Sequence, residues 1–226
     1  MIANRPRFDA VCFDCDSTLS GIEGIDELAD RVGCGPQVAR LTEAAMNGLV
    51  PLEEIYAKRL DVVRPDRSAL AWLAQRYAEE AVSGAAETIA TLRRHGKAVY
   101  VVTSGLLQAV DEFAGSLGFS PEQIHAVKVY FDDVGAYQGF DTSSPLCRSD
   151  GKAAICQELA TKHGKIAMVG DGLTDLVARA GGAYVVGYGG VAYREAMRRG
   201  ADFYVVTPSL TGTLPALLTH EELARS

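Results

Sequence analysis

Acidic side chains occur in two closely spaced pairs, each directly after a short apolar run. Asp14 and Asp16 follow the first run, and Asp171 and Asp175 follow a later one. Taken alone, either pair could be a solvated turn or an N-cap cluster for the next helix. Together in one crevice, these carboxylates could not all stay ionised without a bound divalent cation or a protonated member. Oxygen-only ligands favour Mg²⁺, so the two pairs predict a Mg²⁺ site.

A hydroxyl and a lysine accompany the acid pairs. Ser104 and Gly105 follow a second apolar run, and Lys152 opens a helical stretch after Asp150 and Gly151. A lysine and a hydroxyl beside Mg²⁺ are suited to binding phosphate oxygens. The order of acid pair, hydroxyl, lysine and acid pair in successive loops favours a functional site over unrelated capping residues.

These side chains need a scaffold that brings the ends of separate strands together. Short apolar runs at 10–13, 99–103, 166–169, 184–186 and 203–206 predict buried strands. They alternate with helical patterns at 85–94, 107–117, 152–162, 173–180 and 192–199. This alternation predicts an α/β fold, with a parallel sheet flanked by helices on both faces. Ligands of such sheets bind just beyond the carboxyl ends of the strands, where the polar residues above are placed.

Two regions depart from this alternation. Between residues 24 and 82 the apolar spacing is helical throughout, and Pro36, Pro51 and Pro65 mark helix starts. We therefore expect residues 21–83 to form a helical insert after the first strand, with residues 1–20 and 84–226 forming the core. The alternation from Val127 to Phe131, followed by a turn-forming segment, predicts a β-hairpin over 127–140.

Composition and charge exclude several classes of protein. The chain has 226 residues, of which 48% are hydrophobic and 23% are charged, as in ordinary globular proteins. Its formal net charge is −7 and it has no basic run, so a nucleic-acid partner is not expected. No segment approaches the ~20 apolar residues of a membrane helix, so no membrane partner is expected either. With 5 cysteines and no secretory signal, we expect a cytoplasmic protein, while monomer and homodimer both remain open.

The ordered motifs resemble the signature of the haloacid dehalogenase-like phosphohydrolases. The matching segments are Asp14-x-Asp16-Ser17-Thr18, Ser104-Gly105, Lys152 and Gly170-Asp171-Gly172-x-x-Asp175. The similarity extends over about residues 8–206, and the helical insert is similar to the cap domain of that family. The resemblance implies a Rossmann-like core with a small helical cap. It also implies hydrolysis of a small phosphorylated metabolite through a phosphoaspartyl intermediate.

The resemblance implies a role for each acidic residue. Asp14 would be the nucleophile that attacks phosphorus. Asp16 would protonate the leaving oxygen and then activate water as a general base. Asp171 would bind Mg²⁺ together with the Asp14 carboxylate and the main-chain carbonyl of Asp16. Asp175 would orient the metal's surroundings and Lys152.

The other matched residues would bind the substrate. Ser104 and Lys152 would hold phosphoryl oxygens, and Gly105 and Thr174 would also contact the substrate. Thr174 stands where the family has an asparagine, and both residue types form hydrogen bonds.

Within the family, the strongest similarity is to the phosphoserine phosphatases. By that resemblance, Glu23 would meet the substrate ammonium and Arg59 the substrate carboxylate, while Met46 also matches. A zwitterionic head group calls for one anion and one guanidinium, and arginine binds carboxylates in a bidentate manner. The implied substrate is O-phospho-L-serine, hydrolysed in the last step of serine biosynthesis.

Two departures from the family pattern, and one other class of protein, leave alternatives to phosphoserine hydrolysis open. Leu106 stands where the family commonly has a glycine, and Leu52 where a phenylalanine often covers the substrate. They keep open a related phosphatase acting on another small metabolite, such as a phosphorylated amino alcohol or sugar. A receiver-like signalling module would also combine acidic residues, a phosphorylated aspartate, a hydroxyl and a lysine. The helical insert and the position of Asp16 argue against that module.

Overall fold

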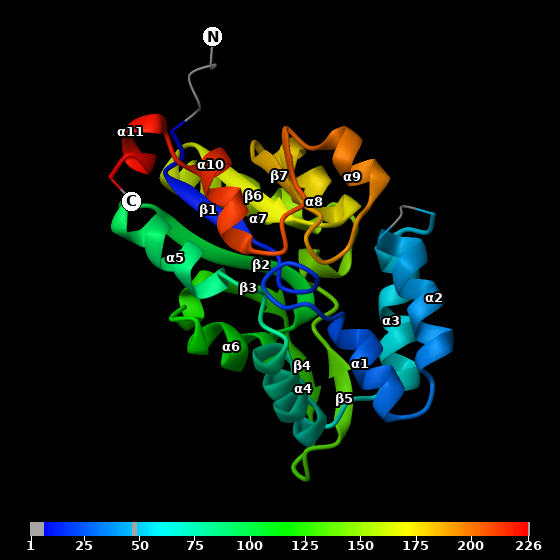
Figure 1. Ribbon diagram of the computed structural model, residues 1–226. Coiled ribbons are helices and arrows are strands. Elements are labelled where there is room, and N and C mark those ends of the chain that lie inside the picture. The colour runs from blue at the N-terminus through cyan, green and yellow to red at the C-terminus, as the bar shows by residue number, and fades with distance from the viewer. Residues whose placement is uncertain (1–6, 47–48, 226) are drawn as a thin grey trace.

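The computed structural model describes residues 7–46 and 49–225. Residues 1–6, 47–48 and 226 lie outside the described residues, as does the side chain of Met46. Within the described part, helices surround a β-sheet, and a group of helices stands to one side of it (Figure 1).

Six strands in the described ranges form a parallel sheet in the order β3-β2-β1-β6-β7-β8. Their bounds are β1 Ala10–Phe13, β2 Ala98–Leu106, β3 Ile124–Val127, β6 Ile166–Gly170, β7 Tyr184–Tyr188 and β8 Phe203–Val205. The central strand β1 is buried along its whole length between β2 and β6. A strand covered on both faces is apolar throughout, so it is recognisable in the sequence as a continuous apolar run. The five predicted strands and the α/β class are confirmed.

The edge strand β3 was not predicted. It pairs with β2 in parallel, and it includes Val127, which the sequence analysis wrongly assigned to the hairpin. Only Ile124 and Val127 of this strand are buried, because an edge strand is less fully covered, so no continuous apolar run marks it. The hairpin itself is confirmed in a shorter form, with β4 Val129–Phe131 antiparallel to β5 Tyr137–Phe140.

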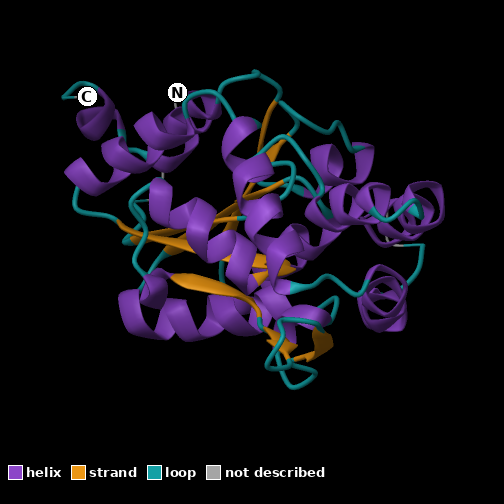
Figure 2. Cartoon of the chain, turned by 90° about the horizontal axis from the view of Figure 1, so that it is seen from below, coloured by secondary structure: helices purple, strands orange, loops and turns teal. Residues whose placement is uncertain are grey.

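Right-handed crossovers place α5 Ala85–Arg94 and α6 Leu107–Ser116 on one face of the sheet, and α7 Gly151–His163 and α8 Leu173–Val177 on the other. Figure 2 shows helices on both sides of the strands.

The helix predicted at 173–180 is α-helical only over α8, and its remaining residues form a 3₁₀ turn. The helix predicted at 192–199 is α9 Glu195–Gly200, which starts later, so Arg194 lies in the loop before it. The remaining elements are α10 Leu214–Leu217, α11 His220–Leu223, and 3₁₀ turns at Pro121–Gln123, Pro145–Cys147, Ala178–Gly181 and Leu210–Thr213.

The predicted insert between β1 and β2 is helical in its described residues. It contains α1 Gly24–Arg31, α2 Gly35–Met46, α3 Leu52–Val63 and α4 Arg67–Glu79. Pro36 is the second residue of α2, Pro51 is the N-cap of α3, and Pro65 lies just before the N-cap of α4. Proline suits such positions because its fixed φ fits a helix start, where its missing N–H costs nothing.

Two short linkers connect the insert to the core. They run side by side, since the Gly21 N–H donates to the Glu80 carbonyl at 2.8 Å and the Val82 N–H donates to the Leu19 carbonyl at 2.9 Å. The last helix of the insert, α4, packs against α6 of the core. That residues 21–83 act as a separate cap domain stays a prediction.

Among the described residues, no helix combines the length and the apolar character that crossing a membrane requires.

Candidate active site

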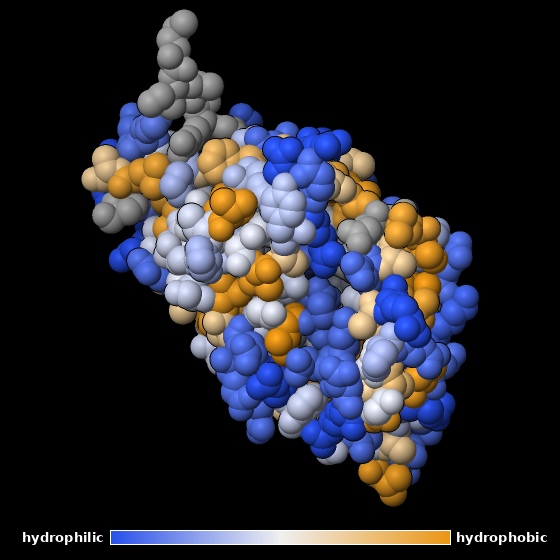
Figure 3. All heavy atoms as spheres, turned by 45° about the vertical axis from the view of Figure 1, so that its right-hand side comes forward, coloured by the Kyte–Doolittle hydropathy of each residue, from blue (hydrophilic) through white to orange (hydrophobic). Residues whose placement is uncertain are grey.

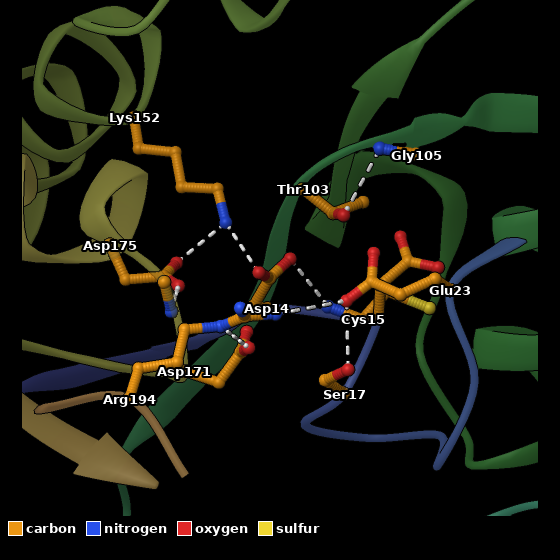
Figure 4. A network of polar contacts seen from close by, with 12 residues as sticks. Asp14, Cys15, Ser17, Glu23, Thr103, Gly105, Lys152, Asp171, Asp175 and Arg194 are labelled. Carbon is orange, nitrogen blue, oxygen red and sulfur yellow. Dashed lines mark hydrogen bonds and ion pairs between the residues drawn. The ribbon is translucent and has the colours of Figure 1, made fainter. Parts of the chain in front are cut away.

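The predicted site residues meet at the carboxyl edge of the sheet. Asp14 follows β1, Asp171 follows β6, and Lys152 is the second residue of α7 (Figure 4). Ser104 lies near the carboxyl end of β2. A cavity at this edge is lined by residues from all of these segments, including Asp14, Asp16, Ser104, Lys152, Asp171 and Thr174. The parallel sheet thus brings together side chains that lie far apart in the sequence, as the sequence analysis predicted.

Lys152 is the buried cation at the centre of the site. Its Nζ lies 2.6 Å from Asp14 Oδ2 and 2.5 Å from Asp175 Oδ1 (Figure 4). Burial lowers the pKa of Lys152, but the carboxylates of Asp14 and Asp175 outweigh burial and raise it above the ordinary value. Lys152 therefore carries its charge at the edge where a phosphate would bind.

Carboxylate oxygens of Asp14, Asp171 and Asp175 lie within 4.8 Å of one another. Burial, followed by repulsion from Asp14, raises the pKa of Asp171 to about 6 and that of Asp175 to about 8. Buried like charges at this spacing need a compensating cation, and a set of oxygen donors fits a hard divalent ion. This cluster includes Asp175, to which the sequence analysis gave only a supporting role. The Asp16 side chain is not part of the cluster and instead contacts Gly24 and Tyr77.

The Asp16 carboxylate accepts two hydrogen bonds, both at the same oxygen. Its Oδ1 accepts hydrogen bonds from the Gly24 N–H at 2.6 Å and from the Tyr77 hydroxyl at 2.8 Å. Burial and the charge of Asp14 raise the pKa of Asp16 to about 6, although both hydrogen bonds favour the charged form. A carboxyl group with this pKa can give and take a proton near neutral pH, which suits a general acid and base.

Ser104 presents an unpaired hydroxyl to the same cavity. Its Oγ is buried and has no hydrogen-bond partner within the part of the chain that the structure describes. A buried hydroxyl without a partner is costly, so its position suits an acceptor supplied by a ligand. Gly105 follows it closely, with its N–H directed to Thr103 Oγ1 at 3.1 Å.

A second cavity adjoins the first and is lined in part by helices of the insert. It shares Asp16, Glu23 and Ser104 with the first cavity and adds Arg59 and Gly105. Figure 3 shows the molecular surface hollowed between the core and the insert helices, with hydrophilic residues gathered along the hollow. The residues predicted to bind phosphate and those predicted to bind the head group therefore line two adjacent cavities.

Arg59 is buried and lines this second cavity. It is 5% exposed, and its Nη1 donates to Thr42 Oγ1 at 3.1 Å. Its Nε is buried without a partner among the described residues. Leu52 and Leu106, the two departures from the family pattern, are buried and line the same cavity.

Arg194 is a site residue that sequence analysis missed. Its Nε lies 2.8 Å from Asp171 Oδ2, and its Nη2 lies 3.8 Å from Glu23 Oε1, which also accepts a hydrogen bond from Ser17 at 2.8 Å (Figure 4). Burial raises the pKa of Glu23 well above its usual range. Arg194 is therefore a second cation, besides Lys152, that faces the acidic residues of the site. Arg194 lies in the loop after the carboxyl end of β7, so the strand-end rule could have found it.

Comparisons with known proteins identify the family. The model of the haloacid dehalogenase-like hydrolases matches residues 8–181. A chloroplastic phosphoserine phosphatase of Arabidopsis thaliana is 39% identical over 201 residues, covering 87% of this chain and 68% of the relative. The phosphoserine phosphatase of Homo sapiens is 33% identical over 199 residues, covering 87% of this chain and 88% of the relative. A solved structure described as a phospho-aspartyl intermediate analogue of phosphoserine phosphatase is similar, with a TM-score of 0.80 and 25% identity, covering 94% of this chain and 100% of that one. The chain therefore belongs to the haloacid dehalogenase-like hydrolases, within the family of the phosphoserine phosphatases.

Proposed function

We propose that this protein is a Mg²⁺-dependent phosphomonoesterase that hydrolyses O-phospho-L-serine to L-serine and phosphate. The observation that carries the proposal is that two adjacent cavities share Asp16, Glu23 and Ser104 in their linings. One presents Asp14, Lys152 and the unpaired Ser104 hydroxyl, and the other presents the buried Arg59 beside Glu23. Phosphoserine has a phosphate at one end and a carboxylate and an ammonium at the other, which matches this distribution of charge.

The aspartates supply the covalent chemistry of the proposal. The Asp14 carboxylate attacks phosphorus while the bond from phosphorus to the serine oxygen breaks, and Asp16 gives its proton to that oxygen. L-serine then leaves an acyl phosphate on Asp14. Asp16 next takes a proton from water, and the resulting nucleophile attacks phosphorus, which releases phosphate and restores Asp14.

The cluster of Asp14, Asp171 and Asp175 supports a resident divalent cation. In the proposal, Asp14, Asp171 and the Asp16 carbonyl hold Mg²⁺, while Asp175 orients Lys152 and the metal's surroundings. The ion would neutralise negative charge on the phosphoryl group.

The remaining residues position the two ends of the substrate. Ser104 and Lys152 bind phosphoryl oxygens, helped by Gly105 and Thr174, which line the adjacent cavities. Arg59 binds the carboxylate, and Glu23 binds the ammonium.

A cytoplasmic location and a small-molecule partner complete the proposal. All five cysteines lie in the described part of the chain and are free thiols, which agrees with a reducing compartment. The family match removes the support for a receiver-like module, because the matching model is that of hydrolases.

The direct test is phosphate release from O-phospho-L-serine beside a panel of phosphorylated amino alcohols and sugars. We expect kcat/KM to be highest for phosphoserine with Mg²⁺, and we expect turnover to be lost in EDTA and recovered when Mg²⁺ is restored. Metal-dependent turnover that prefers another ester would contradict the substrate. In that case Leu52 and Leu106, whose branched side chains line the cavity, become the first candidates for the altered specificity.

Replacing Arg59 with alanine tests the head-group assignment. Truncating one partner of a buried charged contact costs about 2–4 kcal/mol, so kcat/KM for phosphoserine should fall by roughly 30- to 1000-fold. p-Nitrophenyl phosphate has no carboxylate, so its turnover should change little. Arg64→Ala is the matched control, because Arg64 follows α3 but is exposed and lies against Tyr137, away from the cavity. An equal loss for both substrates in Arg59→Ala would refute the assignment.

A further inference from the structure

We infer that Tyr77 is a positioning residue for proton transfer, holding the Asp16 carboxyl group so that its free oxygen faces the leaving group. This inference rests on the proposed function, since it assigns Tyr77 to the same reaction. The Tyr77 hydroxyl donates to Asp16 Oδ1 at 2.8 Å, across 61 positions of sequence. None of the sequence motifs pointed to this tyrosine.

The orientation of the Asp16 carboxyl group is fixed because two donors bind the same oxygen, Oδ1. The Gly24 N–H donates to the same Oδ1 at 2.6 Å. A Cβ on Gly24 would lie 2.0 Å from the Tyr77 hydroxyl oxygen, so any larger residue would force the two donors apart. Glycine at position 24 is thus required for both hydrogen bonds to form together.

The other oxygen of Asp16 lies close to Gly105, the residue that follows the cavity-lining Ser104. A Cβ built on Gly105 would lie 3.3 Å from Asp16 Oδ2, which places this oxygen against the end of β2, next to Ser104. In the inference, Oδ2 is therefore the oxygen that gives its proton to the ester oxygen of the substrate. Oδ1, held by two donors, serves to fix the orientation of the carboxyl plane.

Tyr77 is itself anchored to the core. Its side chain is 1% exposed, and its ring stacks on Phe113 of α6 with centroids 5.6 Å apart. Its carbonyl accepts a hydrogen bond from Ser20 Oγ at 3.1 Å, which ties the end of α4 to the first linker. Tyr77 lies in the helical insert by sequence, but its contacts fix it to the sheet side of the site. Such an anchored donor can define the geometry of Asp16 closely, as efficient proton transfer requires.

The step that the test isolates is the first of the two proton transfers by Asp16, the one that accompanies phosphoenzyme formation. Asp16 Oδ2 gives its proton to the serine oxygen as the phosphorus–oxygen bond breaks, while Tyr77 keeps its own proton throughout. An alkoxide is a poor leaving group and needs that proton, whereas p-nitrophenolate departs as an anion. Loss of the Tyr77 hydroxyl should therefore slow phosphoenzyme formation from alkyl esters and spare phosphoenzyme formation from the aryl ester.

The experiment compares Tyr77→Phe with the wild-type protein on both esters, measuring kcat/KM and the single-turnover rate of phosphoenzyme formation at saturating substrate. General acid–base catalysis contributes ~10²–10⁴-fold. We expect the single-turnover rate with phosphoserine to fall by about 10- to 100-fold as part of that contribution. Its KM should stay nearly constant, and kcat/KM for p-nitrophenyl phosphate should stay within about 3-fold of wild type.

Tyr188→Phe is the matched control. Tyr188 is buried in β7, and its hydroxyl donates to the Pro208 carbonyl at 2.8 Å, outside the site. This variant measures the effect of deleting a buried tyrosine hydroxyl on stability, and its kcat/KM should match wild type for both esters.

Equal losses for both esters in Tyr77→Phe, or no loss for either, would overturn the inference. If the wild-type protein prefers another alkyl phosphate, the proposed substrate fails. The same comparison, made with that preferred alkyl ester, then still decides the role of Tyr77.

Discussion

Replacing Asp14 with asparagine is expected to abolish phosphate release, with kcat falling by on the order of 10⁵-fold, as when a catalytic nucleophile is removed. The amide has no negative charge and cannot form the acyl phosphate. It keeps the shape of the side chain and an oxygen that can accept the Cys15 N–H, which now donates to Asp14 Oδ1 at 2.7 Å. Lys152 retains its contact with Asp175, so the variant should remain folded. Steady-state phosphate release and thermal unfolding measure the two effects separately.

The covalent intermediate gives a second readout for Asp14. Wild-type protein quenched in acid during turnover should carry phosphate from labelled substrate, and the asparagine variant should carry none. Asp133→Asn is the control, because Asp133 is exposed in the turn of the hairpin between β4 and β5 and should leave turnover unchanged. Turnover of the Asp14 variant above about 1% of wild type would mean that another group is the nucleophile, since loss of a nucleophile costs far more.

Much of this site could be predicted because strand ends in a parallel sheet converge. Asp14, Ser104 and Asp171 each follow an apolar run, and β1, β2 and β6 are neighbours in the sheet. An apolar run needs no tertiary information to be recognised, since burial on both faces leaves its mark in consecutive residues. The same reasoning predicted the sheet and most helices of the core.

The residues that escaped prediction depend on contacts between elements distant in sequence. Tyr77 lies on a helix whose apolar face gives no sign of which neighbour it contacts, and only the packing of α4 on α6 brings its hydroxyl to Asp16. Arg194 fell within the helix predicted at 192–199, but α9 starts only at Glu195, which leaves Arg194 in the preceding loop, where it contacts Asp171. The strand β3 was hidden because an edge strand with two buried residues lacks a continuous apolar run.

Replacing Lys152 with methionine is expected to impair both stability and catalysis. Breaking a buried ion pair by removing one partner costs about 3–5 kcal/mol, because Asp14 and Asp175 lose the cation that both now contact. Removing a preorganised positive group from a phosphoryl oxygen should lower kcat/KM by about 10³-fold. Chemical denaturation measures the free energy of unfolding, and initial rates on phosphoserine measure kcat/KM.

Lys97→Met is the matched control for burial. Lys97 is also buried, with its Nζ 3.0 Å from the Phe8 carbonyl and 3.1 Å from Glu222 Oε1, but it lies outside the site. It should lose stability on a similar scale and keep its kcat/KM.

Combining Lys152→Met with Asp175→Asn separates the two roles of Lys152. Neutralising Asp175 removes one of the carboxylates left uncompensated, so the double variant should regain a large part of the lost stability. It should regain no activity, because no cation would then face the phosphoryl oxygens. Activity that returned together with stability would show instead that Lys152 acts only by holding Asp14 and Asp175 in place. The distinction matters because a buried ion pair inside an acidic cluster can stabilise the fold and prepare the site for phosphate, and only the second role requires the charge itself.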